Sequence, residues 1–328
     1  MSHVSSPELV ALGEVLIDFT QAGFSPNGQA LFERNAGGAP ANVAVQAVRL
    51  GMSAQFVGKV GADMHGDFLR RSLQERGVDV SSVVQDPEAF TTLAFVEVDP
   101  RTAERSFSFA RKPGADTRLS PAEVPEQAIR DCHVLHVGSL SLTDEPARAA
   151  TLHAVSIARQ AGALISYDPN YRASLWPSES EAIGQMTMLL HQADLVKINE
   201  DEALLLCGTS NPEAAAQCIL DQGAALVAVT LGSQGALVAT QTERVLVPTR
   251  PCQARDTTGA GDSFWGALLF QLVHEQKMRT ASDLAALSRE TLLCAESFAC
   301  AAASCCVERP GGIPAMPSKD EVLDRLTQ

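Results

Sequence analysis

Residues 131–170, DCHVLHVGSLSLTDEPARAATLHAVSIARQAGALISYDPN, decide the fold class of this chain. The stretch begins with a short apolar run, continues with a helical pattern at 146–160 that Gly162 is placed to end, and closes with a second apolar run. Apolar runs of strand length recur along this part of the chain, at 134–137, 164–167, 195–198 and 224–230. Strands that alternate with helices predict βαβ units. We therefore expect an α/β fold with a doubly wound, mainly parallel sheet flanked by helices on both faces.

The N-terminal third is richer in strands than in helices. Runs typical of strands are found at 9–12, 54–60, 92–98 and 105–110. One helix is expected at 41–50, ended by Gly51. The segments at about 14–36 and 90–113 do not fit the βαβ rhythm, so we expect them to form a small inserted sheet that acts as a lid. No fixed-period repeat, low-complexity tract or linker interrupts residues 1–328, which we expect to form a single domain.

The composition is that of a globular protein with an acidic surface. The chain is 45% hydrophobic and 20% charged, which is too apolar for a disordered protein. Its 25 basic and 39 acidic residues give a formal net charge of −14, which repels phosphate backbones and anionic lipids. We therefore expect no nucleic-acid partner and no membrane partner. A nucleotide can still bind to such a protein if Mg²⁺ and backbone N–H groups handle its phosphates.

Two further features indicate a cytoplasmic protein. Residues 1–8 lack the basic and then apolar plan of a signal peptide, and no apolar stretch approaches the roughly 20 residues that span a bilayer. The chain has eight cysteines, none in a Cys-x-x-Cys pair, and four of them lie within 294–306. We interpret all eight as buried, reduced thiols rather than as disulfides or zinc ligands.

The motif Asp256-Thr257-Thr258-Gly259-Ala260-Gly261-Asp262 precedes an apolar run at 263–273. Glycines at the start of a helix leave backbone N–H groups exposed in front of the positive end of the helix dipole, which makes an anion hole. A carboxylate at Asp262, in the first helical turn, could accept a proton from an attacking hydroxyl group. An ordinary glycine turn with an acidic first turn would give the same pattern. The chain contains no phosphate-binding G-x-x-x-x-G-K-[ST] loop.

A second glycine motif is Gly37-Gly38-Ala39-Pro40-Ala41-Asn42. The glycines allow close approach to a ligand, and Asn42 falls in the first helical turn, where its amide could bind a polyol. A glycine turn before a polar helix start is the structural alternative. Asp18 follows a short apolar run and could accept hydrogen bonds from two sugar hydroxyls, or it could be a solvated acid at a strand end.

Polar residues also follow three of the expected strands, where doubly wound folds bind ligands. Asp168 and Asn170 follow the strand at 164–167. Asn199 and Glu202 follow the next strand and have the spacing of a capping box, although such groups could also hold Mg²⁺ through water. The segment 230–235 has glycines and hydroxyls that suit a nucleotide or a plain β-turn.

Taken together, the two glycine motifs resemble the two signatures of the ribokinase-like (PfkB) sugar kinases, and the resemblance is closest to fructokinases. It covers nearly the whole chain. Other matching stretches are 13–19, 56–61, 111–116, 166–170, 175–177 and 311–314. The resemblance implies a ribokinase-like fold with a β-sheet lid. It also implies ATP-dependent transfer of a phosphoryl group to a sugar hydroxyl, at position 6 of fructose.

The resemblance also implies roles for individual residues. Asp262 would be the general base, and the anion hole would be Gly259, Ala260 and Gly261. The sugar would be held by Asp18, Gly37, Gly38, Asn42 and the lid arginine Arg111, with Arg172 a further candidate. ATP and Mg²⁺ would be bound by Asn199, Glu202, Thr230, Gly232 and Gly235, with Cys300 on the adenine side. A monovalent cation such as K⁺ would be held by Asp256, Thr258, Cys306, Arg309 and Gly311, chiefly through backbone oxygens.

The chain departs from the family pattern at three places. Ser263 replaces the usual alanine, Cys300 stands where fructokinases often have asparagine, and residues 111–114 read RKPG instead of RNPS.

Two other functions stay open. One is a 2-keto-3-deoxygluconate kinase or another PfkB sugar kinase, whose acidic substrate Arg111 and Arg172 could serve, although Phe107 and Phe109 favour a neutral sugar. The other is a non-catalytic sugar-binding or regulatory protein. In relatives the lids of two subunits often clasp, so we expect a homodimer.

Overall fold

The computed structural model describes residues 6–98 and 105–327, without the side chains of 97, 98 and 105–107. Its main element is a nine-stranded sheet in the order β13-β12-β11-β10-β9-β8-β1-β4-β5. The strands from β5 to β11 pair in parallel, and β12 and β13 pair antiparallel at one edge. The bounds are β1 Leu9–Leu12, β4 Ala54–Gly61, β5 Asp79–Asp86, β8 Val134–Gly138, β9 Leu164–Asp168, β10 Leu195–Asn199, β11 Leu226–Thr230, β12 Ala236–Ala239 and β13 Arg244–Val247.

Helices cover both faces of this sheet, as the alternating pattern predicts. In β1, Leu9 and Ala11 pack into one apolar cluster and Val10 and Leu12 into another, because successive side chains point to opposite faces. The first cluster includes side chains from α1 Ala39–Leu50, α2 Met64–Gln74, α8 Ala260–Leu269, α9 Ala281–Ala285, α10 Arg289–Cys306 and α11 Lys319–Leu326. The second includes α3 Glu126–Asp131, α4 Ala147–Ala161, α5 Glu179–Leu190, α6 Glu200–Cys207 and α7 Pro212–Leu220.

Helix ends follow local chemistry. Gly51 and Gly162 end α1 and α4 in left-handed conformations, with φ of 116° and 80°. Helix α1 begins at Ala39, earlier than expected, because Pro40 fits the first turn of a helix. A π-helical segment, Phe270–Glu275, extends α8. Short 3-10 helices lie at Ala115–Arg118, Pro121–Glu123, Leu140–Leu142, Ala173–Leu175, Gly232–Gln234 and Ile313–Ala315.

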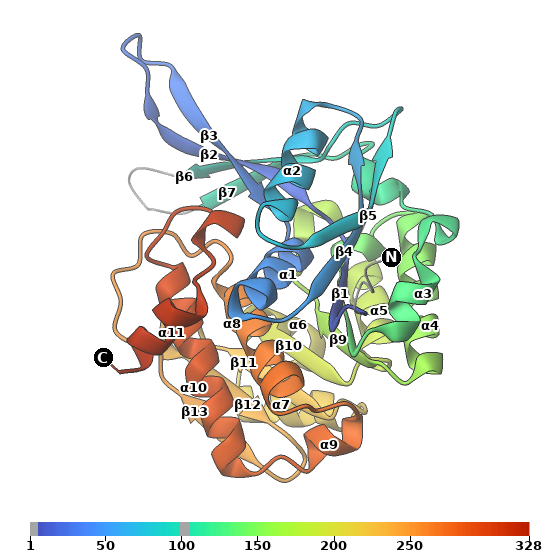
Figure 1. Ribbon diagram of the computed structural model, residues 1–328. Helices are drawn as coiled ribbons and strands as arrows, with labels where there is room; N and C mark the ends of the chain where they lie inside the picture. Colours follow the sequence, from blue (N-terminus) through green and yellow to red (C-terminus); the bar gives the residue numbers. More distant parts are fainter. Residues whose placement is uncertain (1–5, 99–104, 328) are drawn as a thin grey trace.

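A separate four-stranded sheet has the order β3-β2-β6-β7 and falls within the two segments that do not fit the rhythm. Its strands are β2 Leu16–Phe24, β3 Ala30–Gly37, β6 Leu93–Val98 and β7 Arg105–Ala110. Figure 1 shows β2 and β3 extending as a long hairpin from the body of the molecule. Asp18 lies inside β2, where it pairs with Asn35, and not at a strand end, because the strand continues outward into this sheet.

The expectation that all eight cysteines are buried is wrong. Cys132, Cys300, Cys305 and Cys306 are buried, whereas Cys207, Cys218 and Cys252 are half-buried and Cys294 is exposed. Cys294 lies near the start of α10, on its solvent face, and composition alone does not report the face of a helix. All eight are free thiols. Across residues 6–98 and 105–327, no helix has the length and apolar character needed to cross a membrane.

Candidate active site

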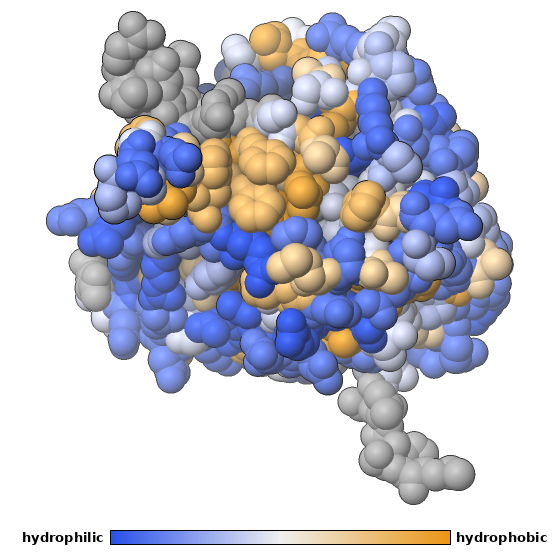
Figure 2. Space-filling view, turned by 90° about the horizontal axis from the view of Figure 1, so that it is seen from above, coloured by the Kyte–Doolittle hydropathy of each residue, from blue (hydrophilic) through white to orange (hydrophobic). Residues whose placement is uncertain are grey.

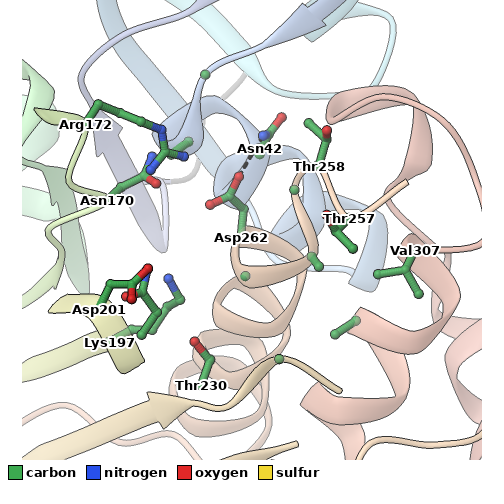
Figure 3. Close-up of a pocket in the computed structure, with 18 of the residues that line it drawn as sticks. Asn42, Asn170, Arg172, Lys197, Asp201, Thr230, Thr257, Thr258, Asp262 and Val307 are labelled. Carbon is green, nitrogen blue, oxygen red and sulfur yellow. Dashed lines mark hydrogen bonds between the residues drawn. The ribbon is translucent and has the colours of Figure 1, made fainter. Parts of the chain in front are cut away.

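A cavity of about 670 Å³ lies beyond the carboxyl ends of the parallel strands. Asn199 at the end of β10 and Thr230 at the end of β11 line it from the main sheet, and Asp18 lines it from the small sheet. The first turn of α8 lies between these walls (Figure 3). The cavity therefore joins the sheet edge, the small sheet and a helix N-terminus, where the sequence analysis expects a sugar and a nucleotide to meet.

The glycine motif forms the N-terminus of α8. Gly259 is the N-cap in a left-handed conformation, with φ of 77°, and lines the cavity with Ala260 and Gly261. The first N–H groups of a helix lack intrahelical partners, and here the Ala260 N–H makes only a long 3.3 Å hydrogen bond to the Thr257 carbonyl, so this turn can receive an anion. Asp262 lies in the first turn, and its Oδ2 accepts a 2.7 Å hydrogen bond from Asn42 Nδ2 (Figure 3). The structure thus brings the two motifs into direct contact.

The environment of Asp262 suits a general base. Burial, together with the negative charge of Asp168, raises the pKa of this carboxyl to about 6. The charge of Lys197, the hydrogen bond from Asn42 and the charge of Arg172 oppose this increase. The carboxylate is therefore ionised at neutral pH, yet basic enough to accept a hydroxyl proton.

Acidic and polar side chains line the end of the cavity next to the small sheet. Burial raises the pKa of Asp18 to about 7, and Arg172 opposes this shift. A Cβ atom on Gly37 would lie 2.0 Å from Asp18 Oδ2, so the glycine makes room for the carboxylate without lining the cavity itself. Gly38 lines the cavity with φ of 111°, a conformation that favours glycine. Phe109 lines the same end, whereas the side chain of Phe107 lies outside the described residues.

The opposite end of the cavity is lined by hydroxyls, glycine and backbone. Its residues include Thr230, Gly232, Ser233, Thr249, Ser304 and Val307. Asn199 and Glu202 form the predicted capping box of α6. The carboxylate of Glu202 is buried, and it accepts hydrogen bonds from the Asn199 and Tyr171 N–H groups at 2.9 and 2.8 Å. Asn199 lines the cavity, but Glu202 supports it from behind.

Besides Gly37 and Glu202, three further positions do not occupy the places that the resemblance implies. Arg111 is buried behind the cavity, where its guanidinium donates to Asp116 Oδ2, Thr143 Oγ1 and the Leu140 carbonyl, each at 2.8 Å. Cys300 points into the core toward the Val247 carbonyl, and a neighbouring turn of α10 lines the cavity instead. Gly235 also lies outside the lining, because its backbone packs against Val247 and Pro248.

The residues implied for a monovalent cation come together from two distant segments. Asp256 Oδ1 accepts from the Thr258 N–H at 2.8 Å, and Asp256 Oδ2 accepts from the Gly311 N–H at 2.9 Å. Cys306 Sγ lies 3.8 Å from the Thr258 carbonyl oxygen. The guanidinium of Arg309 is paired with Glu321, so only its backbone could serve a cation. In the described part of the chain, no cluster of three or more His, Cys, Asp or Glu side chains could hold a metal ion.

Two buried charged residues that line the cavity belong to neither of the site sets expected from the sequence. Lys197 lies in β10 and donates a 2.7 Å hydrogen bond to Asp168 Oδ2. Glu14 follows β1, and its Oε1 accepts from the Ala39 N–H at 3.0 Å. A lysine within the otherwise apolar run LVKI is the signal that could have identified Lys197, since an unpaired lysine is rarely buried.

Comparison with known proteins agrees with this geometry. The family described as pfkB family carbohydrate kinase matches residues 6–319. Fructokinase-1 of Oryza sativa subsp. japonica is 42% identical over 318 residues, which cover 96% of each chain. Fructokinase with bound ATP from Xylella fastidiosa has a TM-score of 0.89 and 35% identity, covering 97% of this chain and 98% of that chain. A double-mutant fructokinase from Vibrio cholerae O395, solved with fructose, ADP and potassium ion, has a TM-score of 0.85 and 30% identity, covering 98% of this chain and 99% of that chain.

Proposed function

This chain belongs to the pfkB family of carbohydrate kinases, and we propose that it transfers the γ-phosphoryl group of ATP to the 6-hydroxyl of D-fructose. It is a fructokinase, and its products are fructose 6-phosphate and ADP. One geometric observation supports the assignment of the catalytic groups most directly. The half-buried carboxylate of Asp262 lies in the first turn of α8, beside the N–H groups of Gly259, Ala260 and Gly261 and in contact with Asn42.

The reaction follows from this arrangement. The 6-hydroxyl oxygen of fructose forms a bond to the γ-phosphorus while the bond from that phosphorus to the β,γ-bridging oxygen breaks, and ADP leaves with the electron pair. Asp262 accepts the hydroxyl proton and later releases it to solvent. The N–H groups at the start of α8 stabilise the charge on the equatorial phosphoryl oxygens.

Fructose would occupy the end of the cavity next to the small sheet. Asp18, Asn42 and Gly38 offer acceptors and close backbone approach for its hydroxyls. Charge also favours a neutral sugar over a keto acid. Asp262 is ionised at neutral pH, and Glu14 and Asp18 are partly ionised because burial raises the pKa of each to about 7. These acids would repel a substrate carboxylate, and Arg172 beside Asp18 and Asp262 is the cation that would attract it. This argument disfavours 2-keto-3-deoxygluconate.

ATP would occupy the other end, with its phosphates directed toward α8. Thr230, Gly232 and Asn199 would contact it, with Thr249 and Val307 along the adenine side. The carboxylates of Glu200 and Asp201 line the cavity and fit a Mg²⁺ ion that arrives with the phosphates and keeps several waters. Bound Mg²⁺ would neutralise phosphate charge. A K⁺ ion near Asp256 and Thr258 would complete the set, as the potassium-bound relative suggests.

The small sheet is proposed as a lid and as a dimer interface. Phe19 and Phe95 stack with ring centroids 5.3 Å apart on the face of the small sheet that also contacts His65 of α2, and Phe32 packs edge-on against Phe95. Phe24 and Phe32 are 67% and 37% exposed. Figure 2 shows apolar side chains gathered on the face seen from above. A second copy of the chain would cover this surface.

The eight free thiols support a reducing, cytoplasmic location.

The function is tested by ADP release with Mg-ATP and K⁺, comparing D-fructose with 2-keto-3-deoxygluconate, ribose, glucose and mannose. We expect a kcat/KM for fructose at least about a hundredfold above the others. A higher kcat/KM for the keto acid would show that the keto acid, and not fructose, is the substrate, and Arg172 would then be the first residue to examine. Sugar binding without turnover of any sugar would instead indicate a non-catalytic protein.

A further inference from the structure

We propose that Lys197 binds the γ-phosphoryl group of ATP from the side of the cavity opposite α8, and that Asp168 is the positioning residue that holds it there. The inference deepens the proposed function and rests on it. The sequence contains no phosphate-binding loop with its lysine. Lys197 would supply the positive charge that such a lysine places next to the phosphates.

Lys197 reaches the anion hole directly. A Cβ atom built on Gly261 would lie 3.2 Å from Lys197 Nζ. Gly261 immediately precedes Asp262 in the first turn of α8, and both line the cavity with Lys197. Figure 3 shows Lys197 entering the cavity from the sheet, across from Asp262. A phosphoryl group seated on the N–H groups of this turn would therefore lie within hydrogen-bond reach of the ammonium.

The fold fixes the direction of this side chain. Val196 and Ile198 pack with the helices on one face of the sheet, so Lys197 between them points to the other face, which α8 covers. Asp168 projects to the same face from β9, and its Oδ2 accepts the 2.7 Å hydrogen bond from Nζ. Its Oδ1 accepts from the Asn170 N–H at 3.1 Å, which fixes the carboxylate.

The ammonium keeps donors for a ligand. It carries three N–H donors, and Asp168 is its one hydrogen-bond partner among the residues that the structure describes. Lys197 is only 5% exposed, and its burial lowers its pKa. The charges of Asp168, Glu202 and Asp262 outweigh burial and raise it, so the side chain stays charged. An incoming phosphate would satisfy the remaining donors.

No other cation in the described lining is placed for this role. The cationic side chains along the described cavity wall are Arg172 and Lys197. Arg172 acts on Asp18 at the sugar end, and its Nη1 donates to the Tyr171 carbonyl. Lys197 lies between that end and the nucleotide end, where the phosphoryl group must pass. A lysine at this point would stabilise the charge of the transferred group most strongly near the transition state.

A purely structural ion pair is the competing explanation, and the chain offers a matched control. Lys59 in β4 is also a largely buried lysine, and it pairs with Glu123 at 2.8 Å and with Asp86 at 3.5 Å. It does not line the cavity. Removing the charge from Lys59 therefore perturbs a similar pair in the same sheet without touching the proposed phosphate site.

The test compares Lys197→Met, Lys197→Gln and Lys59→Met with the unmodified protein. Calorimetry without sugar measures the affinity for Mg-AMP-PNP, which carries a γ-phosphate, and for Mg-ADP, which does not. We expect both Lys197 variants to lose about ten- to a hundredfold in AMP-PNP affinity, with ADP affinity within about threefold. Lys59→Met should keep the ratio of the two affinities. Lys197→Gln retains a donor for Asp168, so the comparison stands if the methionine variant does not fold.

An equal loss of both affinities, or no loss of either, would overturn the proposal and leave Lys197 as a structural partner of Asp168. A kinetic arm adds a second readout. We expect kcat with fructose to fall about 10²- to 10³-fold in Lys197→Met, with the KM for fructose changed little. If the unmodified protein phosphorylates no sugar, the proposed function fails. The nucleotide comparison still decides the role of Lys197 in that case, because it needs no turnover.

Discussion

At the scale of single residues, Asp262 determines whether the cavity can do chemistry. Its carboxylate is the group positioned to accept the hydroxyl proton, and Asn42 orients it. Asp262→Asn keeps the shape but cannot accept the proton, so we expect kcat to fall by about 10²- to 10⁴-fold, with little change in sugar affinity. Steady-state ADP release measures the change, and a thermal melt controls for folding. A kcat within threefold of the unmodified enzyme would exclude Asp262 as the base.

The pH dependence follows from the same carboxylate. Burial and the charge of Asp168 raise the pKa of Asp262 to about 6, and a protonated base cannot accept the hydroxyl proton. We expect kcat to drop about tenfold per pH unit below that value and to level off above it. The hydrogen bond from Asn42 lowers the pKa, so Asn42→Ala should move the midpoint to higher pH. A rate that does not change between pH 5 and 8 would contradict this assignment.

At the scale of elements, α10 carries a buried acid that affects stability. Glu296 is fully buried, its Oε1 accepts from the Val247 N–H at 3.2 Å, and its other oxygen has no partner in the described structure. Burial raises the pKa of Glu296 to about 9 from 4.5. The folded protein therefore keeps a proton that the unfolded chain releases. The free energy of unfolding that this proton contributes is fully present below pH 4.5 and is lost as the pH rises toward 9. At pH 7 the free energy of unfolding is about 3 kcal/mol lower than it is below pH 4.5.

Replacing this acid should stabilise the protein near neutral pH. Glu296→Gln keeps the acceptor for Val247 and cannot ionise, so we expect a higher free energy of unfolding at pH 7 to 9 and a weaker dependence on pH. Denaturant unfolding at several pH values measures both quantities. Glu290→Gln, on the exposed face of the same helix, is the control and should change little. Equal pH dependence in Glu296→Gln and the unmodified protein would show that the buried acid does not hold its proton.

At the scale of the whole molecule, the small sheet decides assembly. Its exposed aromatic face is best covered by a second chain, so we expect twice the chain mass of 34.7 kDa by light scattering at micromolar concentration. Phe32→Asp places a charge in that face and should give a monomer. Leu246→Asp, at a residue 59% exposed on β13, is the matched control and should leave the dimer intact. A monomeric unmodified protein, or a Phe32→Asp dimer, would contradict the proposed interface.

The amino-acid sequence by itself determined the features that depend on local spacing. The alternation of apolar runs with helical patterns predicted the parallel sheet, because strands and helices impose periods of 2.0 and 3.6 residues. The glycines before residue 260 predicted a helix with an open N-terminus, and Asp262 lies in its first turn as expected. The turn glycines Gly51 and Gly162 marked helix ends for the same local reason.

Only the tertiary structure decided which side chains meet. Lys197 and Asp168 come from different strands, and their contact with the start of α8 depends on strand order and on which face of the sheet each side chain takes. Arg111 turns inward because Asp116 and Thr143 satisfy its guanidinium, and Cys300 turns into the core. Such orientations arise from packing between segments far apart in the chain, and no local pattern records that packing.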